Sequence, residues 1–147
     1  MRELEKLRTQ NAIALLDVAT LGTVTLEPNT KLRLLGAEGE AQKLDLLRGT
    51  VHARINAPPR LFIVKTPVAD AVDLGCEYTL TVDEQGAGRL AVSYGAVSLE
   101  RPSHAPTLVT QGTWCPIGAQ GPGTPLAMTA SESLRRAAED LDSGESA

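Results

Sequence analysis

The stretch that decides the fold covers residues 88–100 and reads GRLAVSYGAVSLE. In its first half, Leu90 and Val92 alternate with polar or small residues, which is typical of a strand with one buried face. Gly95 then interrupts the run before a second candidate strand, residues 96–100. Glycine lacks a Cβ atom, so it tolerates positive φ and lets two backbones approach closely. The stretch therefore predicts a strand, a glycine corner and another strand.

This unit recurs along the chain. The pattern G-x-V-x-[LA] begins at Gly22, Gly49 and Gly95, each time after an alternating strand, and a weaker copy begins at Gly112. The first three glycines are predicted to be structural corner residues. Their spacing is too irregular for a strict β-helix. We therefore expect an all-β fold of stacked, corner-turning antiparallel β layers, solenoid-like or jelly-roll-like in arrangement.

Short runs rich in Val, Leu, Ile and Thr continue on both sides of these units, separated by Gly, Pro, Asn and Asp. Such runs predict strands. The gaps between them are too short for the crossover connections that parallel neighbours need. The candidate strands are 12–18, 22–26, 31–35, 42–47, 49–55, 60–65, 69–74, 76–82, 88–94, 96–100, 106–109 and 112–116.

The length of 147 residues corresponds to one domain. Short helices are expected only at the two ends, the second with an apolar stripe that includes Leu134 and Leu141. The predicted parts are an N-terminal helix or leader (1–11), the β domain (12–117), a Gly/Pro strap (118–128), and a C-terminal helix and tail (129–147).

Composition excludes several classes of partner. Aromatic residues make up only 3% of the chain and the net charge is −4, which argues against nucleic acid as a partner. No apolar run is long enough for a membrane span. The N-terminus also lacks the apolar core of a signal peptide. Taken literally the chain is cytosolic, or it is the soluble part of a longer anchored protein.

The sequence predicts no catalytic, cofactor or metal site. The pair Asp70 and Asp73 points to opposite faces of a strand, which is unsuitable for acid–base work. Cys76 lies beside Glu77, which disfavours a nucleophilic thiolate. The four candidate metal ligands lack the short spacings of zinc sites, so we expect no metal at His52, Cys76, His104 and Cys115. The two cysteines themselves allow either buried thiols or a disulfide in an oxidising compartment.

An ordered set of segments gives the chain a family resemblance. The set comprises LLRGTV at 46–51, FIVKTP at 62–67, AVDLGCEYTL at 71–80 and LAVSYGAV at 90–97, with an opening at 22–32 and a closing element at 108–112. Over residues 18–117 it resembles the FecR domain family, the periplasmic domain of sigma-factor regulators. No single segment is specific, but their complete order is.

The resemblance implies a non-catalytic interaction or sensing domain of a bacterial envelope signalling system linked to sigma-factor regulation. It implies a periplasmic location and a protein partner in the cell envelope. The family's anti-sigma segment, membrane helix and C-terminal partner-binding domain have no counterpart in this sequence, so the sigma-binding activity itself is not expected. The alternative is an envelope-associated ligand-binding or structural β module for polysaccharide or lipid.

One departure from the family pattern concerns the cysteines. Where the family has G-T-x-F-x-V, this chain has GCEYTL at 75–80. It resembles a cysteine-bearing variant of the family. In that variant Cys115 is the natural partner of Cys76, so the resemblance implies a disulfide that joins a central strand to the closing strand.

Overall fold

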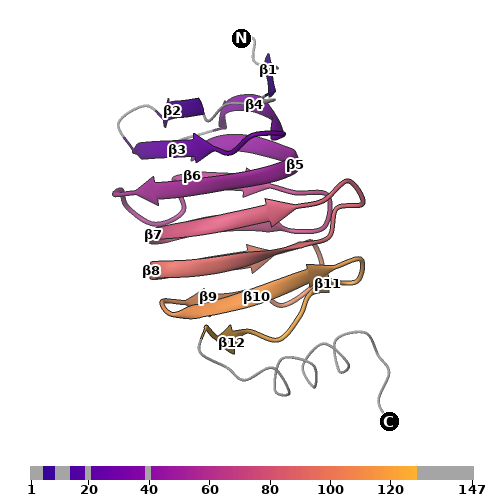
Figure 1. The fold of residues 1–147 in the computed structure, drawn as a ribbon. Helices are drawn as coiled ribbons and strands as arrows, with labels where there is room; N and C mark the ends of the chain where they lie inside the picture. The colour runs from indigo at the N-terminus through magenta and orange to yellow at the C-terminus, as the bar shows by residue number, and fades with distance from the viewer. Residues whose placement is uncertain (1–4, 9–13, 19–20, 39–40, 129–147) are drawn as a thin grey trace.

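Three long strands form the centre of the fold: β5 (Ala41–Ile55), β7 (Asp70–Val82) and β8 (Gly88–Glu100). The structure is a computed structural model, and it describes residues 5–8, 14–18, 21–38 and 41–128. In this part the strands stack from the N-terminal to the C-terminal end of the chain (Figure 1). The other strands are β1 (Glu5–Arg8), β2 (Ala14–Val18), β3 (Gly22–Leu26), β4 (Lys31–Glu38), β6 (Phe62–Lys65), β9 (Thr107–Thr110), β10 (Thr113–Gly118), β11 (Gly121–Pro122) and β12 (Leu126–Ala127).

Each long strand belongs to two half-sheets. Residues 49–55 of β5 pair with β3 and β7, whereas residues 41–48 pair with β4 and β6. The front half-sheet has the order β2-β3-β5-β7-β8-β10, and the back half-sheet has the order β1-β4-β5-β6-β7-β8-β9. Buried side chains from both halves form one hydrophobic cluster, so the inner faces pack against each other.

Glycines mark the places where the long strands pass between half-sheets. Gly49 of β5, Gly75 of β7 and Gly95 of β8 have φ angles of +108°, +93° and +77°. A Cβ on Gly95 would lie 1.9 Å from the carbonyl oxygen of Gly75, so two backbones meet at this corner. Gly22 instead begins β3, where a Cβ would lie 2.1 Å from the carbonyl oxygen of Arg54.

At each corner the inward-facing residues change from even-numbered to odd-numbered positions, or the reverse. In β8 the buried residues are Leu90 and Val92 before the corner, and Val97 and Leu99 after it. The pairing of β7 with β8 also shifts in register at the corner, which is the behaviour of a β-bulge. Because one extra residue reverses the faces of a strand, the corner keeps apolar side chains on the inner face of both half-sheets.

The expected strands are present, with two differences in how they are joined. The pairs of strands expected on either side of Gly49, Gly75 and Gly95 are continuous strands. The layers are also not purely antiparallel, because β6 pairs with β5 in parallel. The loop at 56–61 leads β6 into the back half-sheet beside β5, so no helical crossover is needed. The fold is all-β with a mixed sheet.

Two expectations concern the ends of the described region. The N-terminal helix is not formed at Glu5–Arg8, which make up β1 and pair with β4. The expected Gly/Pro strap is partly β-structure, because two of its segments, β11 and β12, pair with β10 as strands of the sheet. The C-terminal helix expected within 129–147 lies outside the described residues. Among the residues described there is no helix that could cross a membrane.

Candidate interaction surface

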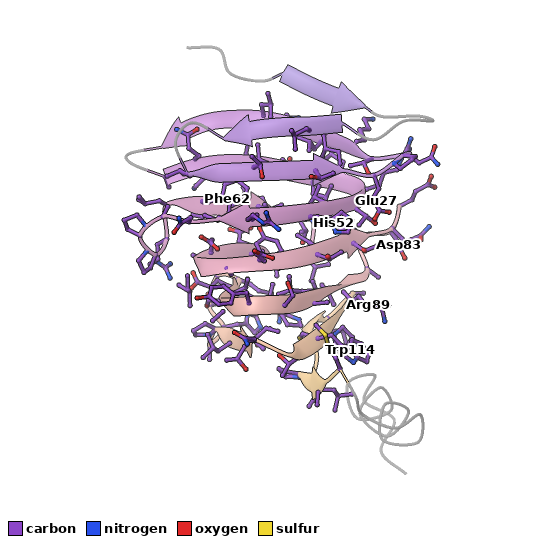
Figure 2. The ribbon with its side chains drawn as sticks, turned by 60° about the vertical axis from the view of Figure 1, so that its left-hand side comes forward. Glu27, His52, Phe62, Asp83, Arg89 and Trp114 are labelled. Atoms are coloured by element: carbon purple, nitrogen blue, oxygen red, sulfur yellow. The ribbon has the colours of Figure 1, made fainter. Side chains whose placement is uncertain are left out.

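The outer face of the front half-sheet carries polar side chains that alternate with the core. Thr25 of β3, His52 of β5 and Thr79 of β7 are direct neighbours across the three strands. The same line continues through Ala91 of β8 to Trp114 of β10. Figure 2 shows His52, with Glu27 beside it, and Trp114 further along the stack of strands.

This face is hollowed into a groove of about 420 Å³ that crosses several strands. Most of the side chains that line it are polar. Its hydroxyl, imidazole, guanidinium and carboxylate groups offer both donors and acceptors. We call this hollow the front groove. Its polar outward-facing lining consists of Thr23, Thr25, His52, Arg54, Glu77, Thr79 and Ser93.

Cross-strand hydrogen bonds hold these side chains in place. The Nε2 atom of His52 lies 2.5 Å from Oε2 of Glu27, and its Nδ1 atom lies 2.8 Å from Oγ1 of Thr79. With the proton on Nε2, His52 donates to Glu27 and accepts from Thr79. Arg54 contacts Glu77 at 3.1 Å in the next row. Both ring nitrogens of His52 are therefore engaged in a structural network at the surface.

The groove reaches a strand edge at one end. β2 pairs with β3 and with no other strand of the described region. Leu15 of β2 lines the groove and is 68% exposed. An open strand edge offers unpaired backbone groups to another chain. The edge and the exposed leucine together give the groove a side that a second polypeptide can approach.

The outer face of the back half-sheet is covered by its own ion pairs. The guanidinium of Arg60 donates two hydrogen bonds of 2.9 Å to the carboxylate of Glu100, which also accepts one from Ser98. These hydrogen bonds from Arg60 lower the pKa of Glu100. Lys65 likewise pairs with Asp70 at 3.1 Å. Ion pairs therefore link neighbouring segments on the outer face of this half-sheet as well.

The structure separates most residues singled out in the sequence. His104 lies in an exposed turn, with Nδ1 2.9 Å from the carbonyl oxygen of Pro102. Asp70 is an outward ion-pair partner, whereas Asp73 points inward and is fully buried. In the described part of the chain, no three His, Cys, Asp or Glu residues are grouped as metal ligands.

The disulfide expected between Cys76 and Cys115 is not formed. Both residues are free, buried thiols. Cys76 pairs with Gly95 at the corner of β8, whereas Cys115 pairs with Leu90 of the same strand. The two positions are therefore separated along β8 as well as across it. Both thiols lie in the core and donate weak hydrogen bonds there, Cys76 to Asp73 and Cys115 to backbone carbonyl oxygens.

Sequence reasoning missed the cluster of Asp73, Cys76 and Tyr78. The spacing D-x-x-C-x-Y gives no single inner face in a regular strand, because residues 73 and 76 have opposite parity. The corner at Gly75 reverses the parity and turns all three side chains inward, where each is at most 2% exposed. Recognising Gly75 as a corner would have revealed the cluster.

The geometry agrees with what comparison with known proteins shows. Two crystal structures, at 2.50 and 1.65 Å resolution, of a protein provisionally assigned as an anti-sigma factor from Parabacteroides distasonis ATCC 8503 share the fold. Each has a TM-score of 0.73 and 15% sequence identity to this chain. They cover 89% and 91% of this chain, which spans only 63% and 65% of theirs.

Comparison with curated proteins gave no match. The family model described as FecR protein, however, matches residues 5–98. The match includes all of β5 and β7 and most of β8, the three strands that carry the corners. Since it extends over more than half of the sequence, the chain belongs to the FecR family.

Proposed function

We propose that this chain is a sensing and interaction domain of a bacterial envelope signalling system that regulates a sigma factor. The family match over residues 5–98 carries the proposal, because FecR proteins are regulatory. The fold shared with the Parabacteroides protein provisionally assigned as an anti-sigma factor supports it. The domain acts by binding a protein partner, without turnover of a substrate, and its place is the periplasmic side of the membrane.

We place the partner on the front groove. His52, Arg54, Glu77 and Thr79 are fixed by cross-strand contacts, so their polar groups are pre-organised for a second chain. The open edge of β2 adds backbone groups that pair with an extended segment. Both faces carry cross-strand ion pairs, but of the two only the front one has the groove and, beside it, the exposed Leu15 on the β2 edge.

The proposed binding unit is the β domain at 12–117 together with the strap at 118–128. The strap belongs with the domain because β11 and β12 extend the sheet beyond β10. A protein with this unit intact should retain the front groove. The segments 1–11 and 129–147 are proposed to lie outside the binding unit, although β1 extends the back half-sheet, because neither segment lines the front groove.

Site-specific photo-crosslinking in the native bacterium tests the placement. A photoreactive residue at Ser93, which lines the groove, should capture an envelope or sigma-regulatory protein that mass spectrometry then identifies. The matched control carries the same residue at Thr110, an exposed position of β9 in the back half-sheet. We expect an adduct from position 93 and at least tenfold less from position 110.

The same experiment can contradict the proposal in two ways. Equal adducts from both positions would show that the front groove has no special role. A specific adduct with a protein unconnected to transcription would leave the groove as the binding site but refute the link to a sigma factor.

A further inference from the structure

The carboxyl group of Asp73 lies in the core, and none of the described ion pairs gives it a positively charged partner. Asp73 of β7 is 0% exposed. Its Oδ1 atom accepts a hydrogen bond from the thiol of Cys76, and its Oδ2 atom has no hydrogen-bond partner. The hydroxyl of Tyr78, in the same cluster, is also buried without a partner. Buried polar groups are normally satisfied, so this cluster requires an explanation.

The groups around Asp73 carry no compensating positive charge. Cys76 and Tyr78 are the titratable neighbours from β7 itself, and burial raises the pKa of both. β8 presents Val97 opposite Asp73, and the pairing of β6 with β7 ends one residue before Asp73, at Ile63 and Val72.

The remaining element near Asp73 is the loop at 56–61. From this loop, Arg60 offers only its backbone N–H, 2.7 Å from the carbonyl oxygen of Asp73. Its guanidinium is directed to Glu100 instead. None of the ion pairs in the described residues includes Asp73. An ionised carboxylate in this position would be buried and unpaired.

We infer that Asp73 is held as the neutral acid in the folded domain, and that loss of its proton opens the corner of β7. The structure thereby contains a proton-responsive element between its two half-sheets. The direction agrees with electrostatics, since burial raises the pKa of Asp73 more than the hydrogen bonds from the Cys76 thiol and the Gly75 backbone lower it.

At the corner of β7, opening breaks fewer backbone hydrogen bonds between β7 and β8 than elsewhere along these strands. Paired positions of β7 and β8 stop at Asp73 and resume at Cys76, which leaves Leu74 and Gly75 outside the ladder. The adjoining loop carries Arg60 at a φ of +70°, an uncommon conformation for a residue with a side chain. Movement of this short segment would bring the Asp73 carboxylate to water while the long strands stay paired on either side.

Amide hydrogen exchange as a function of pH tests the inference. The amide of Arg60 reports the opening, because it is bonded to the carbonyl oxygen of Asp73. After correction for the intrinsic rate, its opening constant should rise tenfold per pH unit from about pH 4, the ordinary Asp pKa, up to the raised pKa. The amide of Asn56, bonded to the carbonyl oxygen of Leu21, is the internal reference.

Variants identify the responsible group. Asp73→Asn keeps the shape of the neutral acid, so the corrected Arg60 exchange should lose its pH dependence in this window. Asp70→Asn, on the same strand but facing outward toward Lys65, should retain it. A pH dependence that survives in Asp73→Asn, or disappears in Asp70→Asn, would overturn the inference.

A second measurement keeps the test decisive if Asp73→Asn does not fold. Infrared difference spectra of the unmodified protein, with isotope-labelled aspartate, should show one protonated carboxyl band that persists above the ordinary pKa of aspartate. If every aspartate of the folded protein is ionised in that range, the inference is wrong.

Discussion

At the scale of single residues, Gly95 decides whether the two half-sheets can meet. Its φ of +77° disfavours any side chain, and a Cβ would lie 1.9 Å from the carbonyl oxygen of Gly75. Gly95→Ala should therefore lose about 1–2 kcal/mol of unfolding free energy from left-handed strain. Overpacking should remove a further 1–3 kcal/mol or so. Urea denaturation measures the sum.

Gly112 provides a matched control for this prediction. It has a similar φ of +83°, but an added Cβ would meet nothing within 4 Å. Gly112→Ala should therefore lose only the strain component, about 1–2 kcal/mol. If the two variants are equally destabilised, close backbone approach at the corner of β8 is not what requires glycine there.

At the scale of elements, the sequence contains nearly all the information about strand position. Alternation of apolar residues predicts β3 and most of β4, because one face of each is buried. The pattern breaks at Gly49, Gly75 and Gly95, which suggested separate strands. In the structure each strand continues through the break, and only the set of inward-facing residues changes. A bulge and a turn interrupt the alternation of apolar residues in the same way, so the sequence pattern does not distinguish them.

The parallel pairing of β6 was less accessible from the sequence. Strand partners depend on where a loop directs the chain, and the loop at 56–61 carries no pattern that specifies β5 as the neighbour. The front groove was also not predicted, because it requires residues from five strands to lie side by side. Of its members, the sequence singled out His52, as one of four residues too widely spaced to bind a metal, and Glu77, as the acidic neighbour of Cys76.

The loop at 56–61 also stabilises the fold through the ion pair between its Arg60 and Glu100 of β8. Glu100→Gln should lower the unfolding free energy by about 0.5–1 kcal/mol at pH 7, a modest amount because the guanidinium is 56% exposed. Since Arg60 lowers the pKa of Glu100, the pair's stabilisation is complete above the ordinary glutamate pKa of about 4.3. It should disappear as the pH falls through the lowered value.

Denaturation at several pH values measures this contribution. The matched control is Glu84→Gln, since the Glu84 side chain is 73% exposed and lies 3.7 Å from Arg48. An exposed, loosely paired carboxylate should contribute little at any pH. A loss from Glu100→Gln that is independent of pH would show that the Arg60 pair is not its cause.

At the scale of the whole molecule, the sharing of β5, β7 and β8 links the two half-sheets covalently as well as through the core. Each half contributes one wall of the same hydrophobic cluster. If either half were lost, the other would expose its inner face to water. The half-sheets are therefore not separate folding units, although the corner of β7 can open locally while they remain paired.

This architecture predicts that both half-sheets unfold in one transition. Trp114, the only tryptophan, reports the front half-sheet from β10. A second variant, Trp114→Phe with Leu108→Trp, moves the probe to β9 of the back half-sheet, where Leu108 is 55% exposed. In each protein the fluorescence and far-ultraviolet circular dichroism midpoints in urea should coincide, as two-state unfolding requires. The prediction is wrong if, in one of the two proteins, the fluorescence midpoint comes at a lower urea concentration than the circular dichroism midpoint. The half-sheet that carries the tryptophan in that protein would then unfold first, and the shared strands would not couple the two half-sheets.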